Sequence, residues 1–578
     1  MKFKIKVTKG KRTKTKKNLK PLGKMTPEKK RKMEELALLR KRAKSEEDSE
    51  GGEETESSSQ PPFFRRRIEE IEREQEKRPP PLPGLKDTRF LSEKIKTSPG
   101  KAKASEKSKS PLKIIEWGIL GLLVWTPLAA GSVSDWAVLI IQLCVLFMAA
   151  SYIWMKNKPG PPEYLQASIK WRKYFFYGLV LLLAFQIVPL PKFLVKILSP
   201  NTYALKSQYV PDFSQIKFLG LSVIPSHTIK QGLQFLAYIL FGFLILKTMT
   251  KRKQILRLFY IIVGMGVFQA FYGLFELYNP NPRILFYEKI HSLETVTGTF
   301  VNRNHLSGYL EMAIPIAIGL ILSRIDLFPK GKLKLRERIV RLSEKGLAKN
   351  LLLAGGILIM AIGIVLSQSR SGVFLLVFAF LLFLELAVLF LREARYRQIW
   401  TKRFLQIMFL GITLLSLYVG IEATLERFSL DEVQKSNRPL VWANTMEIAR
   451  DFPLFGSGLG TFNAVYPAYE IRSHSGHYSH AHNDYLEYLS ELGILGMVFL
   501  LGGILFLLYT TFRVWRDRRH PEVKGLVMGG VVAVICMLIH SIADFNLHIP
   551  ANMLLFTAVL TLTYNTAFYK FLKPSNSR

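Results

Sequence analysis

The sequence predicts an all-α membrane protein that crosses the bilayer many times. From Lys113 onward, apolar runs alternate with short polar connections. The runs are roughly 17 to 25 residues long, which is the length that a helix needs to cross about 30 Å of hydrocarbon. Lys and Arg gather in every second connection, as expected where cytoplasmic connections hold the positive charge. Residues 1–110 differ from this pattern and form a separate region.

Twelve spans account for the apolar runs. They are residues 114–131, 136–155, 174–190, 229–249, 255–277, 305–323, 350–366, 372–391, 404–420, 486–512, 525–541 and 550–570. If the N-terminus is cytoplasmic, the five inner connections hold 29 Lys and Arg in 79 residues, whereas the six outer ones, longer in total, hold 13. This asymmetry places both termini in the cytoplasm and the long connection 421–485, between spans nine and ten, outside.

Residues 1–110 are predicted to be a disordered, basic, cytoplasmic tail. They contain 33 Lys and Arg against 18 Asp and Glu, with polar segments such as "SEEDSEGGEETESSSQPP". A basic tail can bind nucleic acid, but one beside a first span is better explained as a topology determinant lying against anionic lipid, so no nucleic-acid partner is expected. The start of the chain lacks a signal-peptide pattern, and we expect insertion to begin at the first span. Cys144 and Cys536 fall within spans, which predicts no disulfide.

The long outer connection 421–485 contains two recognisable segments. "RPLVWANTMEIARDFPLFG" is typical of a helix lying along the membrane interface, with an apolar face formed by Leu440, Trp442, Ile448 and Phe452. The following "GSGLGTF" has G-x-G-x-G spacing with no preceding strand, which favours a turn over a nucleotide-binding loop.

Cationic side chains lie at the outer ends of two spans. Arg303, Asn304 and His305 begin span six, and Arg370 lies in a five-residue outer hairpin between spans seven and eight. A hairpin this short holds its guanidinium close to the ends of two helices. The residues alone leave two interpretations open, an ion pair with an acidic side chain or a bound anion such as phosphate.

Four histidines within nine residues precede span ten: His474, His477, His480 and His482. An H-x-H pair is compatible with one metal ion, but no carboxylate or cysteine lies at a familiar ligand spacing. His482 instead comes directly before Asn483 and Asp484, which are good helix N-cap types, so it lies at the positive end of a helix dipole. A neutral imidazole there can take a proton from a hydroxyl beside a bound anion. We therefore favour catalysis and expect no metal and no cofactor.

Several of these segments together resemble a known family. The pattern H-N-x9-G-x-x-G, formed by His482, Asn483, Gly493 and Gly496, occurs with "GTFVNRNHLSGYL", "SQSRSG" and "RPLVWANTMEIARDFPLFGSGLGTF". In their order along the chain, the segments are similar to the O-antigen ligase and O-antigen polymerase superfamily, over roughly residues 290–500. Gly493 and Gly496 also offer a flat face for packing against a neighbouring span.

The resemblance implies that residues 111–578 form a GT-C-like glycosyltransferase. Such an enzyme moves a glycan from an undecaprenyl-pyrophosphate carrier to an acceptor hydroxyl on the outer face, without metal. The resemblance makes His482 the catalytic residue, and Arg303 and Arg370 the cations that hold pyrophosphate. Further candidates for substrate contact are Asn304, Asn483 and Arg438, with Arg472 a weaker one.

The superfamily divides by acceptor, and the motifs are shared among its branches. Ligases use lipid A core, polymerases use another lipid-linked repeat, and relatives glycosylate proteins; we favour a ligase-like transfer. The implied location is the bacterial inner membrane, with the active site facing the periplasm. A transporter of lipid-linked glycans is a different class that also has twelve spans, but it predicts ionisable residues at mid-membrane, of which the spans contain few.

The charge asymmetry makes a topological prediction. Reporter fusions at about Lys330 and Arg516 should report cytoplasm, whereas fusions at about Ser436 and Leu547 should report the outer compartment, because Lys and Arg concentrate in the inner connections. Alkaline phosphatase activity from the fusion at Lys330 would contradict the whole orientation.

Overall fold

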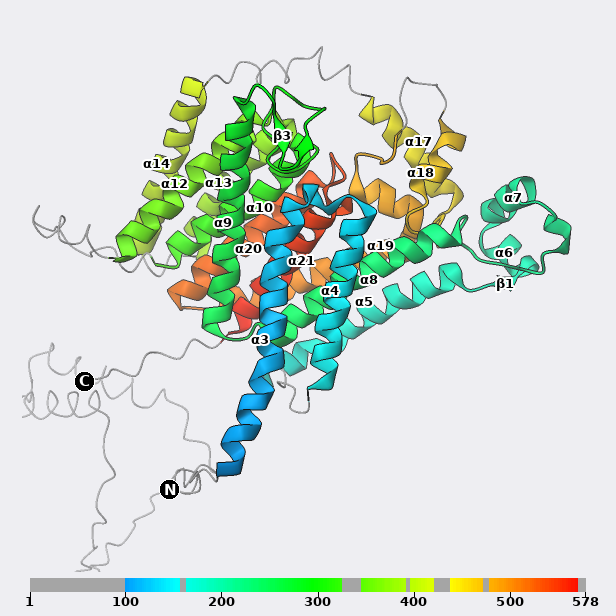
Figure 1. Ribbon diagram of the computed structural model, residues 1–578, viewed down its shortest axis with the longest axis horizontal. Helices are drawn as coiled ribbons and strands as arrows, with labels where there is room; N and C mark the ends of the chain where they lie inside the picture. The colour runs from blue at the N-terminus through cyan, green and yellow to red at the C-terminus, as the bar shows by residue number, and fades with distance from the viewer. Residues whose placement is uncertain are drawn as a thin grey trace, which may run out of the picture. The chain divides into compact units, whose positions relative to one another are not determined.

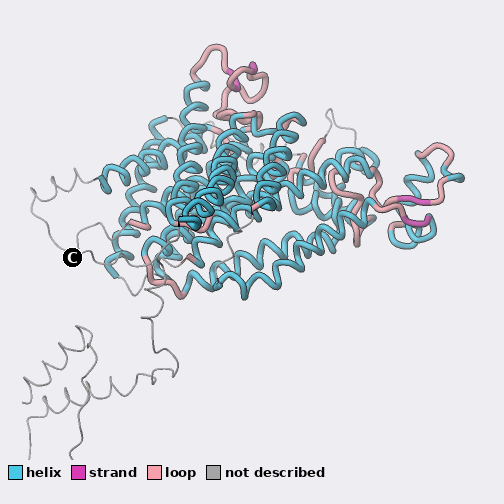
Figure 2. The backbone as a smooth tube through the Cα atoms, turned by 60° about the horizontal axis from the view of Figure 1, so that its bottom comes forward, coloured by secondary structure: helices cyan, strands magenta, loops and turns pink. Residues whose placement is uncertain are grey.

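The computed structural model describes an almost entirely helical chain (Figure 2). The described residues are 99–155, 163–324, 345–390, 395–419, 437–470 and 478–569. Predictions that fall on the tail before residue 99, on His474 and His477, and on Arg472 lie outside these ranges. Helix α3 (Pro99–Leu128) already includes residues 99–110, which we had assigned to the disordered tail. The helix of the first span continues through these residues, whose Ala and Lys side chains are good helix formers.

Nine helices of the described chain are long and apolar enough to cross a membrane (Figure 1). They are α3, through Pro111–Leu128, α4 (Asp135–Trp154), α8 (Pro225–Thr248), α9 (Arg252–Leu277), α10 (Arg303–Leu322), α12 (Lys345–Leu366), α13 (Arg370–Phe390), α19 (Asp484–Arg516) and α20 (Pro521–His540). Three more helices overlap predicted spans but do not meet the same criteria: α5 (Glu163–Ile187), α14 (Arg395–Val419) and α21 (Pro550–Phe568). The all-α membrane fold is thus confirmed, and the count of twelve stays a prediction.

Short elements occupy the connections between these helices. They are η1 (Ala130–Ser132), α6 (Lys192–Leu198), α7 (Pro200–Tyr209), η2 (Phe213–Gln215), α17 (Arg438–Asp451), α18 (Phe462–Val465), η5 (Tyr466–Tyr469) and η6 (Asn546–His548). Two antiparallel pairs form the described strands, β1 (Leu190–Pro191) with β2 (Phe218–Leu219), and β3 (Arg283–Ile284) with β4 (Tyr287–Glu288). Each strand has two residues, so the pairs close loops and do not build a sheet core.

Helix α10 is the centre of the bundle and is buried along its whole spanning length. It packs against α9, α12, α13, α20 and α21. Its closest neighbour is α20, because Gly319 of α10 faces Gly525 and Gly529 of α20 and lets the two backbones approach. The first turn of α10, which begins at Arg303, is therefore held on a rigid support.

A glycine-containing turn fits against a break in α19. Gly456, Gly458 and Gly460 have positive φ, and the N–H of Gly458 donates to the carbonyl of Glu491 at 3.0 Å. The string is thus a turn, as predicted. Gly493 has φ 65° and interrupts the helix where this turn packs, so its predicted place on a flat helical face is wrong. A Cβ on residue 493 would fill the space that the backbone of the turn occupies.

The α10–α20 contact predicts a stability difference between two glycine substitutions. In Gly529→Ala the new Cβ would lie 2.6 Å from the carbonyl oxygen of Pro315, which is backbone and cannot easily move. We expect a loss of about 1 to 3 kcal/mol, the range for overpacked cores, and a lower Tm in detergent. Gly264→Ala in α9 is the control, because nothing lies within 4 Å of its Cβ. Equal Tm values for the two variants would contradict this account of the interface.

Candidate functional site

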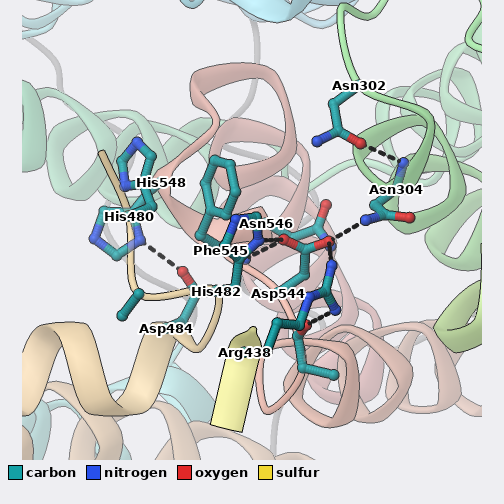
Figure 3. A network of polar contacts seen from close by, with 12 residues as sticks. Asn302, Asn304, Arg438, His480, His482, Asp484, Asp544, Phe545, Asn546 and His548 are labelled. Carbon is teal, nitrogen blue, oxygen red and sulfur yellow. Dashed lines mark hydrogen bonds and ion pairs between the residues drawn. The ribbon is translucent and has the colours of Figure 1, made fainter. Parts of the chain in front are cut away.

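The carboxylate of Asp544 accepts polar contacts from three separate parts of the chain (Figure 3). Asp544 lies between α20 and α21, and its side chain is 1% exposed. His482 Nδ1 lies 3.1 Å from Oδ1, and Asn304 Nδ2 donates to Oδ2 at 2.6 Å. The guanidinium of Arg438 lies 3.5 Å from Oδ2 and also donates to the carbonyl of Ala543. Asp544 was not among the residues that the sequence singled out, whereas all three of its partners were.

These partners come from the N-terminal ends of three helices. Asn304 is in the first turn of α10, where its N–H donates to the N-cap side chain of Asn302 at 2.8 Å. Arg438 is the first residue of α17, and His482 comes just before α19. Helix N-termini carry partial positive charge, so their convergence favours anions at this place.

The backbone of His482 is held in an uncommon conformation. Its φ is 51°, which is sparsely populated for residues other than glycine. Trp442 Nε1 of α17 donates to the carbonyl of His482 at 3.2 Å, and the imidazole lies edge-on to Phe545 at 4.8 Å. The next residue, Asn483, caps α19, because its Oδ1 accepts from the N–H groups of Tyr485 and Leu486. The predicted start of this helix is confirmed, and the Asn483 carboxamide oxygen is engaged at the cap.

Asp544 remains ionised at physiological pH. Burial raises the pKa of its carboxyl group, but the hydrogen bond with His482 and the charge of Arg438 lower that pKa well below its usual range. A carboxylate with a depressed pKa contributes stability that is present above its unfolded pKa of about 3.9 and is lost as the pH falls through the folded value. The ionised Asp544 can hold the Nδ1–H tautomer of His482, which leaves Nε2 as the nitrogen that can accept a proton.

A second cluster of ionisable groups lies on the other side of Phe545 (Figure 3). His548 Nδ1 lies 2.6 Å from Asp484 Oδ1, and His548 Nε2 lies 3.3 Å from Glu487 Oε1. His480 Nδ1 lies 2.8 Å from the same Glu487 oxygen. Burial lowers the pKa of His548, but Glu487 and Asp484 raise it to about 9. The cluster therefore favours a positive charge at His548, and its His and Glu side chains are of the types that hold metal ions.

The histidines of the H-x-H pair thus belong to different clusters. His480 stacks on Phe545 with ring centroids 4.2 Å apart and faces Glu487, whereas His482 faces Asp544. This geometry does not favour a metal ion bound by both His480 and His482.

Arg303 and Arg370 are the first residues of α10 and α13, and both are partly buried. The two helix starts are neighbours, because Ser307, one turn after Arg303, hydrogen-bonds at 2.8 Å with Ser367, the first residue of the 367–371 turn that leads to α13. The structure therefore brings the two cation-bearing helix ends together. Their role as phosphate ligands stays a prediction.

Several ionisable residues of this region were missed by the sequence analysis: Glu311, Glu487, His540, Asp544 and His548. Glu311 of α10 and His540 of α20 form a buried pair at 2.9 Å. The available signal was "HSIADFNLHIP", residues 540–550, in which a histidine ends one apolar span and an aspartate and a second histidine lie in the short connection to the next. We treated this connection only as a topological turn.

Fold and site together define a helical membrane protein with a buried polar centre at the ends of its helices. Residues 355–501 match the family model described as O-antigen ligase. This match contains Arg370, Arg438 and His482, and it agrees with the resemblance of the sequence to the O-antigen ligase and O-antigen polymerase superfamily. No curated protein matched the sequence.

The contacts of Asp544 predict the effect of Asp544→Asn. The substitution removes the charge that supports His482 while keeping the size of the side chain, and we expect glycan transfer to fall by roughly 10²- to 10⁴-fold, mainly in kcat. Asp451→Asn, at an exposed carboxylate of α17, is the matched control and should stay active. A fully active Asp544→Asn protein would remove the positioning role.

Proposed function

We propose that this protein transfers a glycan from a lipid pyrophosphate carrier, undecaprenyl pyrophosphate, to an acceptor hydroxyl on the periplasmic face of the bacterial inner membrane. The observation that carries this proposal is the His482–Asp544 pair at 3.1 Å. It lies where helix N-termini converge and beside the helix starts that carry the predicted phosphate ligands. The family match to O-antigen ligase over residues 355–501 supports this reaction class.

The chemistry assigns His482 as a general base. Its Nε2 takes the proton of the acceptor hydroxyl while the hydroxyl oxygen forms a bond to the anomeric carbon of the donor sugar. The bond between that carbon and the pyrophosphate oxygen breaks, and the electron pair leaves with the pyrophosphate. Asp544 stabilises the imidazolium that forms and keeps the ring oriented.

The leaving pyrophosphate needs stabilisation more than activation. Arg303 and Arg370 begin two neighbouring helices, so guanidinium charge and helix dipoles would act together on the negative charge that grows as the bond breaks. Guanidinium groups also bind phosphate through two parallel hydrogen bonds, which fixes its orientation. Asn304 and Arg438, held by Asp544, would connect this anion site to the base.

The lipid part of the donor has a matching space in the membrane region. A cavity of about 550 Å³ lies between α5, α8, α19 and α21 and is lined mainly by aromatic and aliphatic side chains. Its wall includes Phe235, whose ring lies edge-on to that of Tyr488 with the ring centroids 6.1 Å apart. Tyr488 in turn stacks on His548 with the ring centroids 4.4 Å apart. These ring contacts connect the cavity wall to the cluster around His548, and the cavity has the apolar lining that part of a prenyl chain needs.

The acceptor distinguishes the branches of the superfamily. Lipid A core as acceptor would make the protein an O-antigen ligase, which we favour; a second lipid-linked repeat would make it a polymerase, and a protein side chain an O-oligosaccharyltransferase. Transport of the lipid-linked glycan is the alternative class, and the buried Glu311–His540 pair is a feature that a transporter could use. Transfer by purified protein in detergent separates the classes, because transport requires two compartments.

The proposed base predicts the result of that assay. His482→Ala should lower the transfer rate by roughly 10²- to 10⁴-fold, the range for lost general acid-base catalysis, with no metal added to the reaction. His227→Ala, at an exposed histidine of α8, should retain activity. The rate is measured as transfer of a labelled glycan from its lipid pyrophosphate. Retained transfer in His482→Ala would overturn the assigned mechanism.

A further inference from the structure

Three atoms of metal-ligand type converge on the far side of Phe545 from the His482–Asp544 pair. His480 Nδ1 lies 2.8 Å and His548 Nε2 lies 3.3 Å from Glu487 Oε1. His480, Glu487 and His548 each offer one ligand atom, and these atoms all lie within 4.8 Å of one another. Ligands placed 2.0 to 2.2 Å from a tetrahedral metal are roughly 3.3 to 3.5 Å apart, so modest outward movement of His480 would admit an ion.

The second polar atoms of His548 and Glu487 are held from outside the cluster. Asp484 Oδ1 lies 2.6 Å from His548 Nδ1, which directs Nε2 toward Glu487. The N–H of Ala481 donates to Glu487 Oε2 at 2.8 Å, which directs Oε1 toward the two histidines. None of these outer contacts would have to break if an ion replaced the direct contacts between the three atoms. A carboxylate that orients a ligating histidine through its other nitrogen is a usual feature of zinc sites.

Burial and charge also favour a cation at this place. The side chains of Glu487 and Asp484 are 2% and 1% exposed, and that of His548 is 6% exposed. Buried carboxylates are costly unless a positive charge compensates them. His548 Nε2 makes no hydrogen bond within the described part of the chain and lies 3.3 Å from Glu487 Oε1, so a bound ion would take the place of the proton that otherwise gives His548 its positive charge.

We propose that His480, Glu487 and His548 bind one Zn²⁺ ion. Two imidazole nitrogens and one carboxylate oxygen are a ligand set that zinc accepts, with a water molecule as the fourth ligand. Phe545 lies between this cluster and His482, so we assign the ion a place beside the transfer site and no step of the transfer itself. The proposal is independent of the proposed function, since it concerns different side chains.

The ion would join three segments of the chain. His480 belongs to the segment that carries His482, Glu487 belongs to α19, and His548 belongs to η6, which follows Asp544. Because one ion would bind a side chain from each segment, it would hold the three segments in register. Zinc would therefore fix the separation of His482 and Asp544 from outside the site.

Zinc content tests the proposal directly. The full-length protein is purified in detergent without a metal-affinity step, and its metals are measured by mass spectrometry. We expect close to one zinc per chain in the wild type and in His291→Ala, which changes an exposed histidine outside the cluster. Glu487→Gln and His548→Ala should each reduce the zinc content at least tenfold. Asp484→Asn keeps all three ligands, and its zinc affinity should fall by roughly 10- to 100-fold.

Replacement by Co²⁺ gives a second measurement that needs no activity. Chelated wild-type protein that is still monodisperse should develop the visible absorption of four-coordinate cobalt, and Glu487→Gln should not. Wild-type protein with no more zinc than Glu487→Gln, and with no cobalt band, would overturn the proposal and leave His548 as a protonated partner of the carboxylates. Neither result depends on whether the protein transfers glycans.

Discussion

The polar site depends on one buried negative charge, the carboxylate of Asp544. A carboxylate that is 1% exposed is stable only if nearby groups replace the water it has lost. Here an amide from α10, a guanidinium from α17 and an imidazole from the start of α19 do so. Each of these groups is also fixed by Asp544. The buried charge of Asp544 is therefore stable only with the three helix starts in this arrangement, and Asp544 in turn holds the three helix starts in place.

The rest of the bundle keeps these helix starts in place. The glycine contacts between α10 and α20 fix the helix that carries Asn304, and the break at Gly493 lets the glycine turn after α17 pack against α19. The positive φ of His482 is an unfavourable conformation, and it persists because Trp442 and the N-cap of α19 hold the residues around it. Strain at a residue so well supported fits a side chain whose position matters for chemistry.

The sequence predicted those features that depend on local or periodic signals. Spans follow from the length of apolar runs, and the start of α19 follows from Asn483, a residue type that satisfies free N–H groups. Asp544 could not be found in this way, because it is 62 residues from His482 and no local pattern connects them. The break at Gly493 was missed for a related reason: it accommodates backbone from a distant turn. The separation of His480 from His482 depends on Phe545, another long-range contact.

Asp544 is expected to act through His482, and a double-mutant cycle on the transfer rate tests this most directly. Transfer rates are measured for wild type, Asp544→Asn, His482→Ala and the double variant, in detergent and with Tm recorded for each protein. If Asp544 works by orienting the base, the transfer rate of the double variant should lie within a factor of about two of the rate of His482→Ala. The reason is that, once the imidazole is gone, Asp544 has no base to orient. Losses that multiply in the double variant would show two independent roles and would contradict the central claim.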